Sequence, residues 1–267
     1  MALVPFPGPQ GSALPVRHEE EDDAAGKMSF LEHLDELRRR IVNSCLAIAV
    51  GIAVTFWKIE DIFNFILAPT RSVLPEGVRL VYTQPGEAFS LYITIALIAG
   101  AVAASPFIML QVWLFIAPGL YANEKKLAIP FVLLTTIGFL GGAAFNHYIA
   151  FPYLMIFFGS FNTPDLAFMP KLQDVFGLYT KMLLGLGLVF QMPAVVYFMA
   201  RMRLVTARFL INNIKYAVLL IFIIAAVITP SADVMTQVIF AAPMLTLYLL
   251  SIGIAWAVVP KRLPSDE

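Results

Sequence analysis

The stretch FLEHLDELRRRI at residues 30–41 concentrates the charged side chains of this sequence that could do chemistry. Glu36–Arg40 and Asp35–Arg39 are acid-then-base pairs four residues apart, which is the favourable order on a helix. In one interpretation, these charges pair with one another on a solvated helix that only fixes orientation. In the other, the helix is a docking surface on which the Glu36 carboxylate is unshared and can bind a guanidinium group.

A helix must position these groups, and the sequence predicts where it begins. Ser29 followed by Glu32 fits a capping box, which marks a helix N-terminus. At helical spacing one face is apolar and consists of Phe30, Leu34, Leu37 and Ile41. The opposite face is charged and consists of Glu32, Glu36, Arg39 and Arg40. We therefore expect this helix to lie at the bilayer surface, immediately before the chain enters the membrane.

A second carboxylate, Glu124, lies in the segment WLFIAPGLYANEKK, where Pro118 and Gly119 predict a turn. If it shares a membrane face with the carboxylate of the N-terminal helix, the two could bind two guanidinium groups. Arginine matches a carboxylate with two parallel hydrogen bonds, which lysine cannot do. The alternative is a solvated loop in which Glu124 is only a neighbour of Lys125 and Lys126.

The composition indicates a polytopic membrane protein. Of the 267 residues, 60% are hydrophobic and only 13% are charged, which is more apolar surface than a soluble domain of this size needs. The single cysteine, Cys45, excludes an internal disulfide and a cysteine metal cluster. The three histidines, His18, His33 and His147, have no metal-ligand spacing, so we predict no metal site.

We divide the chain into three parts. Residues 1–27, with an acidic run at 19–23, predict a disordered cytoplasmic tail and do not resemble a secretory signal. Residues 28–260 form one six-span transmembrane domain, and residues 261–267 form a C-terminal tail. The predicted all-α spans are Ile41–Trp57, Ala88–Ile116, Ile129–Ala150, Phe176–Ala200, Tyr216–Ile228 and Val238–Val259.

Orientation follows from the basic residues. Of the 18 Lys and Arg, 13 fall at the two termini and in the second-to-third and fourth-to-fifth loops. Because cytoplasmic loops are enriched in Lys and Arg, we expect both termini to be cytoplasmic. The other loops, 58–87 and 151–175, contain apolar turns with prolines and predict interfacial helices and a packed cap.

Two spans have unusual features. Pro106 predicts a bend in the second span. The fifth span, residues 216–228, is roughly 20 Å long at 1.5 Å per residue, against a hydrocarbon core of ~30 Å. We therefore expect local thinning of the bilayer around it.

The spans contain few groups for catalysis or ion coupling. Gln191 is the polar side chain nearest the middle of a span, and it suits a helix–helix hydrogen bond as well as a functional site. Gly138 and Gly142 form a GxxxG pair that predicts close helix packing. The sequence contains no G-x-S-x-G motif, no phosphate-binding glycine loop and no convincing internal repeat. These features argue against an enzyme, a cofactor or an ion-coupled carrier.

Five motifs together resemble those of one family. They are HLDELRRRI at 33–41, LAP at 67–69, QVWLFIAPGLYANEK at 111–125, FQMP at 190–193 and TPSADVMTQ at 229–237. From Met28 to Val259 the chain resembles the TatC family, the signal-recognising core of the twin-arginine protein translocase. The resemblance implies a concave, glove-like bundle of six transmembrane helices with both termini cytoplasmic and a structured periplasmic cap.

The resemblance also implies a function. A TatC-like protein is a non-enzymatic receptor in the bacterial inner membrane that binds the twin-arginine signal peptides of folded cargo. It works with the single-span subunits TatB and TatA and associates with further copies of itself in a receptor complex. Export is driven by the proton-motive force, and neither a cofactor nor nucleic acid is involved.

The signal-peptide site that the resemblance implies has five members. Glu36 and Glu124 match acidic positions of the family, which implies that they hold the twin arginines. Arg38 and Arg40 match basic positions that shape the same patch. Phe115 matches a position important for the cytoplasmic site.

Other matched positions imply docking and structural roles. Gln191 stands where some members have Glu, so a protonatable group is lost while a hydrogen-bonding group remains. Together with Thr229 and Gln237, it matches polar positions at which a partner helix docks. Pro69 and Asp233 match positions of the structural cap.

Two other functions remain open from the residues alone. A small carrier or channel gated by the N-terminal helix would move a solute without any other subunit. A structural assembly scaffold would keep its partners after the loss of both carboxylates.

Overall fold

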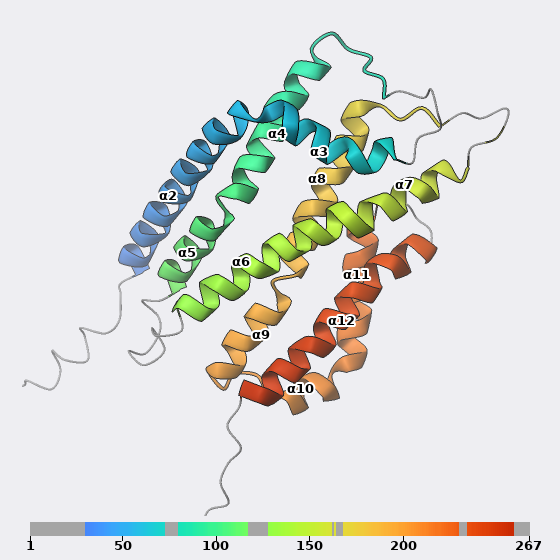
Figure 1. The fold of residues 1–267 in the computed structure, drawn as a ribbon. Coiled ribbons are helices and arrows are strands. Elements are labelled where there is room, and N and C mark those ends of the chain that lie inside the picture. Colours follow the sequence, from blue (N-terminus) through green and yellow to red (C-terminus); the bar gives the residue numbers. More distant parts are fainter. Residues whose placement is uncertain are drawn as a thin grey trace, which may run out of the picture.

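The computed structural model describes residues 30–72, 80–116, 128–161, 163, 168–229 and 234–258 (Figure 1). Nearly all of this part is helical, and an isolated β-bridge pairs Val81 with Lys171. The elements are α2 (Phe30–Trp57), α3 (Ile59–Arg71), α4 (Glu87–Ala103), α5 (Ser105–Ile116), α6 (Ala128–Phe145), the π-helix η3 (Asn146–Ala150), α7 (Phe151–Gly159), α8 (Leu172–Val189), α9 (Met192–Arg201), α10 (Ala207–Asn212), α11 (Ile214–Ile228) and α12 (Val234–Val258).

The predicted all-α membrane class is confirmed. Four stretches are long and apolar enough to cross a membrane, namely Leu31–Trp57, Ile129–Gly159, Leu172–Arg201 and Val234–Val258. The bent pair α4 and α5 passes the same length and hydropathy test when it is taken as one span, and α11 is a shorter apolar helix of 15 residues. These six segments correspond to the six predicted spans.

The charged stretch at residues 30–41 continues directly into the first span, as predicted, and its position at the bilayer surface stays a prediction. α2 runs without a break for 28 residues, and the charged stretch is the first part of the first span. Leu34 and Ile41 are exposed, as expected for a face that meets lipid. Glu36 and Arg40, however, turn toward α5 instead of toward solvent. The predicted cap Ser29 lies outside the described residues.

Two spans depart from a single straight helix near their middle. α4 and α5 meet at a bend of 57° beside Pro106, which cannot continue the hydrogen-bond ladder, so the predicted bend is confirmed. The third span was predicted to end at Ala150, and this boundary was wrong. A π-helical turn joins α6 to α7, and the helix continues to Gly159.

The last three spans agree more closely with the sequence. α8 and α9 together make the fourth span, with a break before Pro193, the second residue of α9. The short fifth span is confirmed, because 15 residues extend only about 22 Å along a helix. The sixth span begins at Val234, one turn earlier than Val238. The thinning of the bilayer around α11 stays a prediction.

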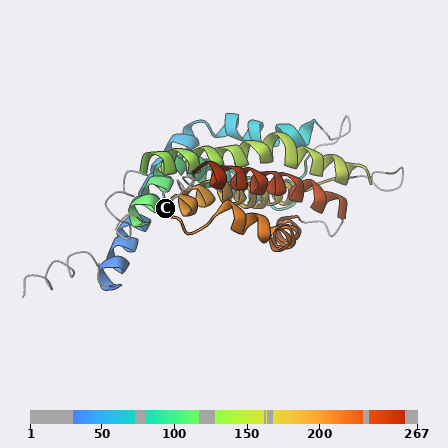
Figure 2. The ribbon, with the colours of Figure 1, turned by 90° about the horizontal axis from the view of Figure 1, so that it is seen from below.

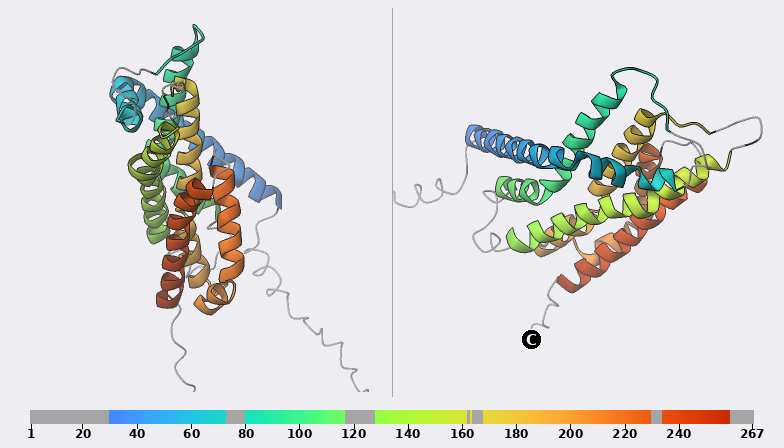
Figure 3. Two further views of the ribbon diagram at one scale, coloured as in Figure 1. Left: turned by 90° about the vertical axis from the view of Figure 1, so that its right-hand side faces the viewer. Right: turned by 45° about the horizontal axis from the view of Figure 1, so that its top comes forward.

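The first and the last helix of the described residues have their outer ends on the same side of the bundle. The beginning of α2 and the end of α12 lie at one end of the bundle, which we call the Glu36 end (Figures 1 and 3). α3 and the beginning of α8 lie at the opposite end, which we call the α3 end. α2 and α5 form one edge of the molecule, and α11 and α12 lie toward the other edge (Figures 1 and 2).

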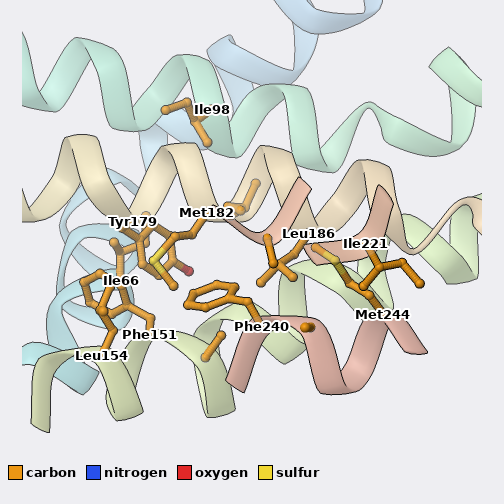
Figure 4. Packing of buried hydrophobic residues seen from close by; sticks show 14 of the residues in the cluster. Ile66, Ile98, Phe151, Leu154, Tyr179, Met182, Leu186, Ile221, Phe240 and Met244 are labelled. Atoms are coloured by element: carbon orange, nitrogen blue, oxygen red, sulfur yellow. The ribbon is translucent and has the colours of Figure 1, made fainter. Parts of the chain in front are cut away.

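The core is centred on one face of α8 (Figure 4). Met182 and Leu186 are fully buried there, and they lie among side chains of α3, α7, α11 and α12. The helices are also apolar on their outer faces; Leu188 and Val227, for example, are 73% and 81% exposed. Helices that are apolar all round are expected in a membrane.

Close backbone contacts hold two helix pairs together. A Cβ atom on Gly138 or Gly142 would lie 2.8 Å from the carbonyl oxygens of Phe190 and Leu186, so the close packing predicted for this GxxxG pair is confirmed. α2 and α4 meet in the same way, because a Cβ on Gly100 would lie 2.6 Å from the Ile52 nitrogen.

We expect Gly100→Ala to destabilise the protein. The new methyl group would collide with backbone atoms of α2 that cannot rotate away, and such overpacking costs about 1–3 kcal/mol. The unfolding of both proteins in detergent, followed by circular dichroism, measures the effect. Gly253→Ala on α12 is the control, since nothing lies within 4 Å of its Cβ position. Equal loss of stability in both variants would contradict the contact.

The α3 end is held by a buried carboxylate. Glu87 is the first residue of α4 and is 5% exposed. Its Oε2 accepts hydrogen bonds from the backbone N–H groups of Thr83 (2.8 Å) and Gln84 (3.2 Å). Its Oε1 accepts one from Gln173 (3.4 Å), near the start of α8. Since free N–H groups gather at helix N-termini, a carboxylate here joins the loop before α4 to α8.

Replacing Glu87 with Ala should loosen this junction. The amides of Thr83, Gln84 and Gln173 would lose their acceptor, and hydrogen exchange measured by mass spectrometry should become faster in peptides that contain them. Glu60→Ala, which removes an exposed acid from α3, is the matched control and should leave these peptides unchanged. Unchanged protection in the Glu87 variant would show that other contacts hold the two segments together.

Candidate functional site

The polar groups at the Glu36 end lie where α2 meets α5. Arg40 donates a hydrogen bond from Nε to Oε1 of Glu36 at 2.8 Å, and a second, shorter contact joins its Nη2 to the same oxygen. Its Nη1 donates to Oε1 of Gln111 at 3.3 Å. Gln111 is 4% exposed, so it fixes the guanidinium group from the interior side. The predicted Glu36–Arg40 pair is confirmed, and the prediction that Glu36 is unshared was wrong.

The Glu36 carboxylate is only partly occupied. Both contacts of Arg40 go to Oε1, and Oε2 has no partner within the described residues. The side chains of Glu36 and Arg40 are 16% and 25% exposed, so the pair is mostly shielded but still reachable. A carboxylate has about four acceptor positions and can bind a second guanidinium group.

An aromatic pair lies beside this carboxylate. The rings of His33 and Phe115 are stacked with centroids 4.5 Å apart and an interplanar angle of 26°. His33 is one turn before Glu36 on α2, and Phe115 is one turn after Gln111 on α5. Phe115, a residue predicted for the site, therefore contacts α2 one turn before Glu36. Such flat faces are suited to stacking against a guanidinium plane.

Arg38 is not part of this group. It is two positions before Arg40, which is about 200° around the helix, and it is exposed. It lies beside Asp35 and Arg39 in a separate hollow of about 440 Å³. The predicted Asp35–Arg39 ion pair does not form between these two described side chains.

Two of the predicted site residues lie outside the described residues. Glu124, the second predicted carboxylate, belongs to the segment at residues 117–127, and Asp233 belongs to residues 230–233. Pro69 lies inside α3 and is buried with Ile66 and Leu67 against the rest of the α3 end.

Gln191 lies at the break between α8 and α9. Its Nε2 donates to the backbone carbonyl of Thr135 on α6 at 3.0 Å. Its Oε1 is buried and has no donor within the described residues. Gln191 therefore serves as a helix–helix hydrogen bond, which was one of its two predicted roles, and it also leaves one free acceptor.

Thr229 and Gln237 each donate a hydrogen bond to a backbone carbonyl of α11. Gln237 on α12 donates to the carbonyl of Phe222 on α11 at 2.9 Å. Thr229 ends α11 and donates to the carbonyl of Ala225 at 2.7 Å. The three residues predicted for partner docking thus make their hydrogen bonds to different helices, α6 for Gln191 and α11 for the other two.

The sequence analysis missed three polar residues that the structure makes important. Gln111 and His33 complete the group around Glu36, and Glu87 holds the α3 end. Gln111 could have been found as a lone amide in an apolar run, four residues before Phe115 on the same helix face. Glu87 could have been found as an acid placed between a Pro-Gly turn and an apolar span.

The chemistry available at the Glu36 end is recognition of cations. Among the described residues, no group of three or more His, Cys, Asp or Glu could hold a metal ion. The site instead offers a half-occupied carboxylate, a fixed arginine and a stacked aromatic pair. This set suits a planar cationic group better than it suits a reaction.

Comparison with known proteins places this arrangement in a family. The family model described as Sec-independent protein translocase protein (TatC) matches residues 32–243. The Sec-independent protein translocase protein TatC of Koribacter versatilis is 43% identical over 250 residues, which cover 92% of both chains. The TatC protein of Desulforapulum autotrophicum is 41% identical over 241 residues, which cover 90% of this chain and 88% of its own.

The chain belongs to the TatC family. Two crystal structures described as the twin-arginine translocase receptor TatC have the same fold, with TM-scores of 0.71 and 0.72 at 34% and 32% identity. Each match covers 84% of this chain, and 97% or 99% of the solved chain. TatC proteins are components of a protein translocase and not catalytic enzymes. Membership of the TatC family therefore decides against a solute carrier.

The shielded Glu36–Arg40 pair should contribute more to stability than an exposed pair. In a double-mutant cycle with Glu36→Gln and Arg40→Gln, we expect a coupling energy of about 1 kcal/mol or more. Lys58 and Asp61, 3.6 Å apart and 70% and 77% exposed, provide the matched control, for which about 0–0.5 kcal/mol is expected. Denaturation in detergent measures both cycles. Equal coupling in the two would mean that α5 does not shield the first pair.

Proposed function

We propose that this TatC family protein is the subunit of a twin-arginine translocase that binds the signal peptides of folded cargo. The observation that supports this most directly is the half-occupied carboxylate of Glu36. Its Oε1 already binds one guanidinium group, that of Arg40, so its surroundings are suited to this partner. An arginine of a signal peptide would bind Oε2 and stack beside Phe115.

The second arginine of the signal peptide is assigned to Glu124. This residue follows α5, the helix that provides Gln111 and Phe115, by only eight residues after Ile116. The assignment rests on the sequence motif and on this short connection. Two carboxylates would explain a preference for paired arginines over paired lysines, because only arginine binds each of them with a planar fork.

Orientation and location follow the charge distribution. Arg38, Arg39, Arg40, Arg201, Arg203 and Arg208 all belong to segments at the Glu36 end. By the positive-inside rule this end faces the cytoplasm, which places both termini there and the α3 end in the periplasm. The membrane is then the bacterial inner membrane, and signal peptides approach from the side on which they are synthesised.

The partner subunits are proposed to be TatB and TatA, together with further copies of this chain. Gln191 is included as a docking position on the family motif alone, because its free Oε1 is buried inside the bundle. Thr229 follows α11, and Gln237 lies in the first turn of α12 and donates to α11. Movement of cargo is proposed to draw on the proton-motive force.

The carboxylate proposal is tested by signal-peptide binding. A labelled twin-arginine peptide should bind the purified full-length chain in detergent, and a twin-lysine peptide should not. Glu36→Gln should weaken binding by about 1–3 kcal/mol, because a charge-assisted hydrogen bond is lost. Fluorescence anisotropy measures the change in Kd.

Glu60→Gln makes the same change on an exposed acid of α3 and should leave the affinity unaltered. Circular dichroism of each variant confirms that its helices are intact. If Glu36→Gln and Glu124→Gln, singly and together, bind the twin-arginine peptide like the original chain, the carboxylate proposal fails.

A further inference from the structure

A buried polar pair lies inside the third span, at the π-helical turn η3. His147 is 5% exposed, and its Nδ1 is 3.2 Å from the hydroxyl oxygen of Tyr179 on α8, which is also buried. Asn146 on the same turn is fully buried and donates to the backbone carbonyl of Tyr179 at 3.4 Å. Polar and ionisable side chains are costly inside a membrane span, and π-helical turns are frequent at functional sites. This turn therefore requires an explanation beyond packing.

The His147–Tyr179 pair has one hydrogen-bond donor left over. A neutral imidazole has one N–H and a phenol has one O–H, and the contact between them uses one of these hydrogens in either tautomer of His147. The other hydrogen has no acceptor on the described residues. Since buried donors are normally hydrogen-bonded, an oxygen atom that is not part of these residues is expected beside the pair.

A cavity of about 510 Å³ lies next to this pair, between η3 and the helices α2, α3, α4, α6 and α8. His147 and Tyr179 both line it. Ligand pockets typically measure about 300–1,000 Å³ and combine an apolar lining with a few polar groups. None of the described residues that line this cavity is charged. A charged group would lose its hydration here without gaining a partner, so the cavity suits a neutral ligand.

The rim of the cavity is apolar and aromatic. Phe65 on α3, Leu140 on α6 and Tyr148 on η3 line the cavity and are exposed, so a ligand can enter from the hydrocarbon of the membrane. The Phe65 ring is stacked on the imidazole of His147, with centroids 4.0 Å apart, and the Tyr148 ring meets the same imidazole edge-on at 4.7 Å. Such side chains favour packing against a flat ring.

A second apolar hollow extends this space along α6. It has a volume of about 390 Å³ and shares Pro106 with the cavity. Leu133 and Ile137 line the hollow, Leu140 lines the cavity, and the three follow one another at one-turn spacing on α6. From His147 to Ile129 the span rises about 27 Å at 1.5 Å per residue. The two spaces thus offer a polar place at η3 and a long apolar track toward the Glu36 end.

We propose that the cavity binds an isoprenoid quinone of the membrane. A quinone is neutral, and it carries carbonyl oxygens on a flat ring with an apolar tail. One carbonyl accepts the spare hydrogen of the His147–Tyr179 pair, the ring packs against Phe65 and Tyr148, and the tail lies along α6. A phospholipid fits less well, because its phosphate would have no positive charge beside it. Glu36, Arg40 and Phe115 line neither space, so this site is separate from the proposed signal-peptide site.

Photolabelling of the full-length chain in phosphatidylcholine nanodiscs tests the proposal. A photoreactive azidoquinone with a decyl tail is added and irradiated, and the labelled peptides are located by mass spectrometry. Labels should lie on α3, on η3 or on α8. Decylubiquinone should displace the label, and decylbenzene, which has the ring and the tail but no carbonyl oxygen, should not. No signal peptide is present, so the result does not depend on the proposed function.

Two variants test the two parts of the site. His147→Phe keeps an aromatic ring but removes the ring nitrogens, and it should weaken displacement by decylubiquinone by about fivefold. Leu140→Trp places a bulky side chain at the mouth of the cavity and should abolish displaceable labelling. The control is His33→Phe, the same change at the Glu36 end and outside both spaces, which should keep the affinity. Circular dichroism confirms that the helices of each variant are intact.

Three results would overturn the proposal. Equal displacement by decylbenzene and decylubiquinone would mean that the carbonyl oxygen is not recognised and that the cavity accepts any apolar chain. An unchanged affinity in both His147→Phe and Leu140→Trp would place any quinone site elsewhere. No displaceable label at all would mean that water or lipid tails fill the cavity.

Discussion

The backbone contact between α2 and the α4–α5 pair determines the geometry of the Glu36 end. At its centre Gly51 and Gly100 lie so close that no side chain fits between them. Four residues further along α2, the Thr55 hydroxyl donates to the carbonyl of Ala96, four residues before Gly100, at 3.1 Å. In the other direction Arg40 lies eleven residues before Gly51, and its partner Gln111 lies eleven residues after Gly100. The antiparallel register is therefore kept across the bend, and it delivers Glu36, Arg40, His33 and Phe115 to one place.

The apolar pattern of the sequence was sufficient to predict the spans but not how the charged stretch joins them. The six segments, the short α11, the bend at Pro106 and the Glu36–Arg40 pair all follow from local rules of helix length, proline and i,i+4 spacing. The prediction that Glu36 is unshared was wrong because the charges were judged on α2 alone. Gln111, 71 residues further along the chain, gives Arg40 a polar partner inside the bundle and holds the guanidinium group beside Glu36. No local pattern contains that information.

The polar residues of the spans show a second limit of sequence analysis. Gln191, Gln237 and Asn146 each donate to a backbone carbonyl of another helix, on Thr135, Phe222 and Tyr179. A carbonyl can accept a second bond at almost any position, so the residue type at the receiving position gives no sign of the contact. The π-helical turn at Asn146–Ala150 is a further feature without a local signal, and it joins α6 to α7, so that the third span continues to Gly159 instead of ending at Ala150. The roles of Glu124 and Asp233 stay predictions from sequence, since both lie outside the described residues.

The charges of α2 are divided between two faces, and this division has an electrostatic consequence. Glu36 and Arg40, which face α5, neutralise each other, and the unfilled Oε2 is then the polar atom that an incoming group meets. The excess positive charge of Arg38 and Arg39 lies on exposed side chains, in the hollow that also contains Asp35. If all three arginines shared one face, their summed charge would repel a cationic peptide over a Debye length of about 8 Å.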